Sequence, residues 1–178
     1  MALSAKALIV KNTQNVSQKE YLDQYLFEMG DTTSKVCGGS SGPFYGAFII
    51  AISDVFKQAR LSSKPLQVAR LLFEGFVNGK NAIQYLGRAE FSDRTMLYVL
   101  HTMTEDMRPK YEAGDLDSMT AKDFFRAVSG PGDVARKEAM DIMPRCGRSQ
   151  YVGERVLGME DPGCEFVYEW CNFLANSL

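Results

Sequence analysis

A chain of 178 residues, 46% of them hydrophobic, is long enough to form one domain with a substantial core. Its formal net charge of −2 gives no bulk attraction to nucleic acid or to an anionic membrane, so neither is expected as a partner. Four cysteines without C-x-x-C spacing and a single histidine argue against a zinc site and favour reduced thiols and a cytoplasmic location.

The N-terminal region carries no signal for a membrane span or for secretion. No stretch approaches the roughly 20 apolar residues that a spanning helix needs, and the apolar run at 7–10 is too short for a secretory core. Residues 1–16 are interpreted as an N-terminal extension, and residues 17–178 are interpreted as one helical domain.

Apolar side chains recur at helical spacing from residue 21 onward. The second predicted helix covers about 41–59, with Pro43 in its first turn, where proline is tolerated. The third covers about 65–85, with Ser62 or Ser63 as its cap. The first helix is predicted from a stripe of large side chains: Tyr21, Leu22, Tyr25, Leu26 and Met29.

Gly75 and Gly79 lie four residues apart in the third predicted helix, where they lower helix propensity. Close approach of a neighbouring helix is the expected compensation. The fourth helix is predicted over about 92–112, with Ser92 or Asp93 as its cap.

The fifth helix is predicted to begin near Thr120 and to break or kink at Gly130-Pro131-Gly132 before the apolar pattern resumes. The last begins at Asp161, with Pro162 in the first helical position, and is expected to bury an aromatic face. No convincing strand pattern is present. The prediction is an all-α fold, a bundle or open barrel of about six amphipathic helices. The face expected to be buried by the last helix comprises Phe166, Val167, Trp170, Phe173 and Leu174.

Three polar segments that contain glycine each precede a predicted helix. They read GGSSGPFYG (38–46, the first corner), GRAEFSDRTM (87–96, the second corner) and GRSQYVGERVLGMEDPG (147–163, the third corner). Helix N-termini present unpaired N–H groups and partial positive charge, so they suit phosphate binding. Each corner also has an ordinary explanation as a turn, a helix cap or a solvated basic loop. The first corner lacks the G-K-[ST] sequence of a P-loop.

His101 lies in the middle of the fourth predicted helix, with no second histidine and no obvious carboxylate partner, and a structural role is expected. Cys164 and Cys171 are seven residues apart, on one face of the last helix, where thiols are usually buried. Ser40 and Ser41 have no nearby base that would make either a hydrolase nucleophile.

In this order and spacing, the three corners resemble the nucleotide-binding L-type (DhaL) domain of the dihydroxyacetone (glycerone) kinase family. The resemblance covers about 11–174, most of the chain. It implies a barrel of amphipathic helices that binds ADP or ATP at one end through the loops between helices. It also implies a K-type partner subunit that holds the substrate.

Carried over position by position, the resemblance implies that Ser40 and Ser41 contact the phosphates and that Gly87 and Met96 border the adenine. Arg148 matches the arginine of the family's G-R-x-x-Y segment. The full set of implied nucleotide contacts is Gly39, Ser40, Ser41, Gly87, Met96, Arg148, Asp161, Pro162 and Gly163.

The chain also departs from the family pattern. Family members bind magnesium through a loop of aspartates ahead of the first corner, whereas here Asp31 is the only aspartate just ahead of it and belongs to a different segment. Magnesium is therefore a family cofactor without matching ligands in this sequence, and transfer chemistry would lack its usual charge neutralisation. Fewer helices than the family barrel are expected to leave apolar faces that a homodimer or another chain would cover.

Three functions fit these observations. The first is an enzyme subunit that presents ADP or ATP to a substrate on a K-type partner. The missing aspartate loop is the feature that discriminates this function from the next. The second is a non-catalytic nucleotide-binding or regulatory module on the same scaffold. The third is part of a longer gene product whose complete form is an ordinary kinase.

Overall fold

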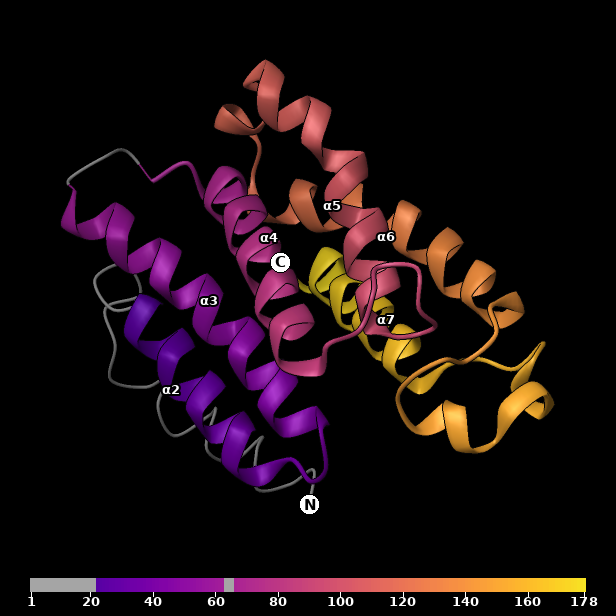
Figure 1. The fold of residues 1–178 in the computed structure, drawn as a ribbon. Coiled ribbons are helices and arrows are strands. Elements are labelled where there is room, and N and C mark those ends of the chain that lie inside the picture. Colours follow the sequence, from indigo (N-terminus) through magenta and orange to yellow (C-terminus); the bar gives the residue numbers. More distant parts are fainter. Residues whose placement is uncertain (1–21, 63–65) are drawn as a thin grey trace.

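The computed structural model describes residues 22–62 and 66–178. All regular structure in these ranges is helical, which confirms the predicted fold class (Figure 1). The 1–16 extension, Tyr21 of the first stripe, Ser63 and Pro65 lie outside the described residues. The α-helices are α2 (Leu22–Val36), α3 (Ser41–Leu61), α4 (Val68–Gly87), α5 (Met96–Ala113), α6 (Ala121–Glu138) and α7 (Pro162–Ser177). Short 3-10 helices are η1 (Asp115–Ser118), η2 (Ala139–Asp141), η3 (Arg148–Tyr151) and η4 (Gly153–Val156).

Helices α2 and α3 lie side by side because small residues face each other along their contact (Figure 1). A side-chain carbon added to Gly30 would lie 2.9 Å from the carbonyl oxygen of Gly46, too close for a real Cβ. At the other end of the contact, the buried carboxylate of Asp23 accepts two hydrogen bonds from Arg60, at 2.8 and 3.1 Å. This pairing fixes the two helices as antiparallel neighbours.

The glycines of α4 have the predicted function of admitting a neighbouring helix. A carbon added to Gly75 would lie 2.9 Å from Cγ1 of Ile52 on α3. A carbon added to Gly79 would clash with the ring of Phe48. The loss of helix propensity at these two positions is therefore offset by close packing of α3 on α4.

An aromatic cluster joins α3, α4, α6 and α7 at the centre of the bundle. Phe76 of α4 is fully buried, and its ring centroid lies 5.1 Å from Phe48, 5.3 Å from Phe124 and 6.2 Å from Trp170. Most of these ring pairs meet edge to face, the arrangement that aromatic quadrupoles favour. Helices far apart in the sequence are thereby held around one core.

The predicted start of the fourth helix, near Ser92, is too early in the sequence. Helix α5 begins at Met96, and neither Ser92 nor Asp93 caps it. Thr95 is the cap, because its backbone is extended and its hydroxyl accepts a hydrogen bond from the N–H of Leu97 at 3.2 Å. Residues 88–95 instead form turns that belong to the second corner.

Of the break or kink predicted at Gly130-Pro131-Gly132, the break is wrong, because α6 continues through all three residues. Pro131 has no N–H to donate within the helix, but an apolar face that includes buried Phe125 and Val128 holds the element together. Gly132 contributes to the packing, since a carbon added there would collide with Met103 of α5.

The predicted buried face of α7 is confirmed only in part, since Val167, Trp170 and Leu174 pack against the core. Val167 is buried as expected, but Phe166 and Phe173 remain 52% and 65% exposed. The fully buried side of the helix consists instead of small residues and thiols: Cys164, Val167, Cys171 and Ala175. Both cysteines are free, in agreement with the prediction of buried reduced thiols. Within the described residues, no helix is long and apolar enough to cross a membrane.

Candidate functional site

The structure brings the three corners together at one end of the bundle. The guanidinium of Arg148, in the third corner, lies against Gly39 in the first corner. A carbon added to Gly87, in the second corner, would lie 3.1 Å from the ring of Phe44 at the start of α3. One added to Gly163, in the third corner, would lie 3.5 Å from the backbone nitrogen of Met96. Figure 1 shows the starts of α3, α5 and α7 converging there.

The first corner offers a helix N-terminus without a side-chain cap. The Ser40 hydroxyl makes no capping hydrogen bond to α3, whereas Thr95 and Asp161 cap α5 and α7. Ser40 is exposed and Ser41 is half-buried at the surface of this end. Two hydroxyls and the first-turn amides of α3 are therefore available to an anion at this position.

Arg148 and Gly39 form a contact that links the first and third corners. Gly39 has φ +68°, in the left-handed region that favours glycine. A side chain at Gly39 would also displace the Arg148 guanidinium from this contact, so the backbone conformation favours glycine and the contact with Arg148 depends on it. The result is an exposed planar cation beside an uncapped helix start, a geometry suited to phosphate oxygens.

Asp161, Pro162 and Gly163 form the start of α7, as predicted. One oxygen of Asp161 accepts hydrogen bonds from the N–H groups of Gly163 and Cys164, at 3.0 and 3.1 Å. The other accepts from the hydroxyl of Ser149 at 3.1 Å. The Asp161 carboxylate therefore shapes the third corner and ties η3 to α7.

The sequence reasoning missed Arg94, which is the most buried charged side chain of this end at 2% exposed. Its guanidinium donates to the backbone carbonyls of Val156 at 2.7 Å and Met159 at 2.6 Å. The second and third corners are thereby joined. No signal in the sequence pointed to Arg94, because helix capping alone accounts for a run of polar residues before a helix.

Asp93, next to Arg94, organises the second corner from within. Its carboxylate accepts the N–H of Glu90 at 2.8 Å and the thiol of Cys146 at 3.5 Å. Burial, assisted by the negative charge of Asp93, raises the pKa of the Cys146 thiol to about 11. The thiol therefore stays protonated at neutral pH and acts as a donor rather than as a nucleophile.

His101 does have a carboxylate neighbour, contrary to the prediction. Its Nδ1 lies 3.9 Å from Glu105 and 3.5 Å from the ammonium group of Lys80. Its ring stacks on Phe91 of the second corner, with centroids 4.6 Å apart. Burial and then the charge of Lys80 lower the pKa of His101, which favours the neutral ring. The expected structural role fits this geometry, since the stack braces Phe91.

Acidic side chains near the corners do not gather into a magnesium site. Within 22–62 and 66–178, no three His, Cys, Asp or Glu side chains are arranged to hold a metal ion. Asp31 pairs with Lys35 on the surface of α2 at 2.5 Å. Asp93 and Asp161 are engaged in the hydrogen bonds described above. The described residues therefore do not fit the magnesium ions that the family resemblance implies.

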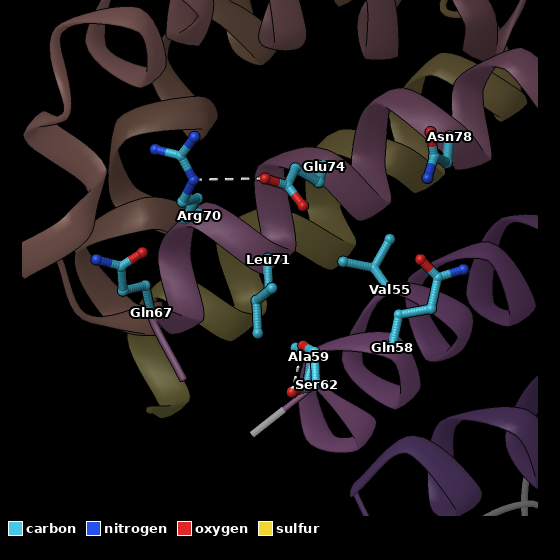
Figure 2. A pocket seen from close by; sticks show the side chains of 9 residues that line it. All are labelled: Val55, Gln58, Ala59, Ser62, Gln67, Arg70, Leu71, Glu74 and Asn78. Carbon is cyan, nitrogen blue, oxygen red and sulfur yellow. Dashed lines mark hydrogen bonds and ion pairs between the residues drawn. The ribbon is translucent and has the colours of Figure 1, made fainter. Parts of the chain in front are cut away.

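A cavity lies between α3 and α4, well away from the corners. The cavity has a volume of about 550 Å³. Figure 2 shows the side chains that line it, with Arg70 and Glu74 paired on α4. The cavity is near the C-terminal end of α3, about 25 Å along that helix from the first corner at a rise of about 1.5 Å per residue. The lining residues are Val55, Gln58, Ala59, Ser62, Gln67, Arg70, Leu71, Glu74 and Asn78.

Known proteins resemble this chain over most of its length. The ADP-binding subunit DhaL of the PEP-dependent dihydroxyacetone kinase of Escherichia coli is 30% identical over 146 residues, 82% of this chain and 65% of that subunit. The ADP-binding subunit DhaL of the PTS-dependent enzyme of Lactococcus lactis is 27% identical over 165 residues, 93% of this chain and 70% of the subunit. D-erythrulose kinase of Mycolicibacterium smegmatis is 28% identical over 134 residues, 75% of this chain and 22% of that enzyme.

The chain thus spans about two thirds of the Escherichia coli subunit, with 65% coverage, and a much smaller part of the longer kinase. The family model of the DAK2 domain matches residues 1–176. The resemblance to the L-type domain of dihydroxyacetone kinases, first indicated by the three corners, is confirmed by these matches. The protein belongs to the DAK2 domain family.

Proposed function

We propose that this chain binds ADP or ATP at the end of the bundle where the three corners meet. The observation that carries the proposal is the convergence of three helix starts, with the Arg148 guanidinium lying against Gly39. Helix N-termini and an arginine fork together favour a phosphorylated ligand. The names of the relatives, which describe ADP-binding subunits, support the same choice of ligand.

Within this proposal, the first corner binds the phosphates. Ser40 and Ser41 donate hydroxyl hydrogen bonds, and Gly39 keeps the backbone close to the ligand. Arg148 supplies the charge that neutralises phosphate oxygens. Gly87 and Met96 border the adenine, while Asp161, Pro162 and Gly163 shape the opposite wall through the start of α7.

We further propose that the domain has the scaffold of a phosphoryl-transfer subunit, which presents its nucleotide to a substrate on a K-type partner subunit, but that it is inactive in transfer without ligands for magnesium. A non-catalytic nucleotide-binding or regulatory module is the second candidate. It is favoured by the engagement of Asp93 and Asp161 in hydrogen bonds that hold the corners. The described residues do not fit a magnesium site, so no step is derived through that ion. Self-association and a cytoplasmic location remain predictions.

Isothermal titration of the full chain with ADP, with and without magnesium, tests the proposal. Weak binding is expected, with little gain from magnesium. Arg148→Ala should weaken it by about tenfold, the loss of one charge-assisted hydrogen bond. Arg126→Ala, which removes an exposed arginine of α6, is the control and should leave the affinity unchanged. Absence of ADP binding, or equal affinities for Arg148→Ala and the parent, would refute the site.

A coupled assay with a competent K-type subunit separates the two candidate functions. No measurable phosphorylation of dihydroxyacetone is expected from the isolated chain plus its partner. Robust turnover would establish the enzyme subunit and refute the non-catalytic module.

A further inference from the structure

Arg94 presents an unusual combination of burial, charge and bonding. The side chain is 2% exposed, and the hydrogen bonds of its guanidinium go to backbone carbonyls rather than to carboxylates. Its two terminal nitrogens donate to the carbonyls of Val156 and Met159, residues 62 and 65 positions further along the chain. Its Nε is buried without a hydrogen-bond partner in the described structure.

A buried arginine that is hydrogen-bonded to carbonyls rather than to a carboxylate lowers the stability of the fold. Burying a cation away from water is unfavourable, and neutral carbonyls compensate less well than a carboxylate would. The helix cap at this point is Thr95, so Arg94 is not needed to begin α5. The positive charge of Arg94 is thus held at the end of the bundle where the anion is proposed to bind, without a direct hydrogen bond to a carboxylate.

The segment that Arg94 holds has few other attachments. Two short 3-10 helices, η3 and η4, make up much of it. Besides Arg94, its ties include the hydrogen bond from Ser149 to Asp161 and the one from the N–H of Gly158 to the carbonyl of Met140 at 2.9 Å. Arg148 lies at the start of this segment. Its position against Gly39 therefore depends on how firmly the rest of the corner is held.

We propose that Arg94 is a positioning residue for the nucleotide. This inference rests on the proposed function, the binding of ADP or ATP where the three corners meet. The planar guanidinium of Arg94 bridges the carbonyls of Val156 and Met159, fixes the third corner to the second, and so holds Arg148 over the first. Its buried positive charge adds to the attraction for phosphate without touching the ligand. Lysine cannot reproduce this role, because a single ammonium group lacks the rigid fork that spans two carbonyls.

The test compares Arg94→Lys and Arg94→Met with Arg108→Lys as the matched control. Arg108 lies on α5, outside the corners, and like Arg94 it makes two hydrogen bonds through its guanidinium, to Glu105 at 2.8 and 2.9 Å. ADP affinity is measured by titration, and amide hydrogen exchange is followed along the full chain without nucleotide. Arg94→Lys should bind ADP about tenfold more weakly and exchange faster in 147–160 alone. Arg108→Lys should match the parent in both.

Chemical rescue distinguishes positioning from general destabilisation. Guanidinium at low millimolar concentration, added to Arg94→Ala, should restore both the protection of 147–160 and part of the ADP affinity. Lost packing would not be restored in this way. The inference is overturned if Arg94→Lys keeps the parent affinity and exchange pattern, or if exchange rises equally throughout α5, α6 and α7.

Failure of the parent chain to bind ADP would refute the proposed function instead. The exchange and rescue data would still decide whether Arg94 holds the third corner. If Arg94→Met fails to fold, Arg94→Lys carries the comparison, because it keeps the positive charge.

Discussion

Lys80 of α4 is a buried cation whose charge is stabilised by a few neighbouring side chains. The side chain is 3% exposed, yet its ammonium group lies 3.0 Å from the Thr104 hydroxyl and 3.4 Å from the Glu105 carboxylate. It also lies 4.8 Å from the centre of the Phe91 ring, in a cation–π contact. Burial lowers the pKa of Lys80, and Glu105 opposes that shift. Glu105 is therefore the partner on which this cluster depends.

Replacing Glu105 by Gln should change the acid stability of the protein. Hydrogen bonds from Arg108, assisted by Lys80, lower the pKa of Glu105 from 4.5 to about 2. A lowered carboxyl pKa contributes stability that is present above pH 4.5 and is lost as the pH falls through about 2. Urea unfolding should show that Glu105→Gln loses roughly 1 kcal/mol at pH 6, since the half-exposed pair is partly screened. The loss should shrink as the pH falls from 4.5 towards 2, because the carboxyl of the unfolded chain becomes protonated before that of the folded protein.

A double variant provides the control for this prediction. Arg108→Gln should flatten the same part of the pH profile, and Glu105→Gln/Arg108→Gln should resemble the single variants rather than their sum. A constant difference between Glu105→Gln and the parent from pH 6 to about 2.5 would show that Glu105 is not ionised preferentially in the folded state.

At the scale of elements, contact between small residues decides which helices are neighbours. The α2–α3 pair meets through Gly30, Gly42 and Gly46, and the α3–α4 pair through Gly75 and Gly79. Glycine weakens an isolated helix, so these positions favour the fold only when the partner helix is in place. The first corner is placed by the same contacts, because it connects α2 to α3.

Gly46→Ala should separate α2 from α3. The added methyl group would collide with the Ser34 hydroxyl and would lie 2.7 Å from the Gly30 carbonyl oxygen. Overpacking of this kind destabilises by about 1–3 kcal/mol. Thermal and urea unfolding measure the loss. Gly38→Ala is the matched control, because nothing lies within 4 Å of the added carbon, and it should change stability by less than about 0.5 kcal/mol. Equal stability of the two variants would disprove the close contact.

At the scale of the whole molecule, the exposed aromatic side of α7 stands beside α3. Phe166 and Phe173 are 52% and 65% exposed, and the ring of Phe166 lies 4.6 Å from Tyr45. Half-buried Trp170 continues the same surface between them. Contiguous apolar surface of this kind tends to be covered by association.

Analytical ultracentrifugation should therefore detect a dimer of the isolated chain at roughly tens of micromolar, where a modest interface is populated. Phe173→Glu should shift the population to monomer, because a charge would be buried in the interface. Tyr85→Ser, at a tyrosine of α4 that is 85% exposed, is the control and should leave the dimer intact. A monomeric parent would contradict the prediction of self-association.

Local sequence patterns determined the helical class, most helix positions and the segments that make up the candidate site. The apolar period identified α3 and α4, and the D-P-G sequence identified the start of α7. Turn chemistry was less informative in 88–95, where Thr95 rather than Ser92 or Asp93 forms the cap. The Gly130-Pro131-Gly132 sequence predicts a break when it is considered alone, but tertiary packing overrides it.

Only the tertiary structure decided how the corners work together. The contact of Arg148 with Gly39 and the bridge from Arg94 to Val156 and Met159 join residues that are far apart in the sequence. The face that α7 buries is likewise set by its neighbours, which accept Cys164 and Cys171 and leave Phe166 exposed. Helical periodicity specifies that a helix has an apolar side, whereas the space between packed helices specifies which side chains fit there.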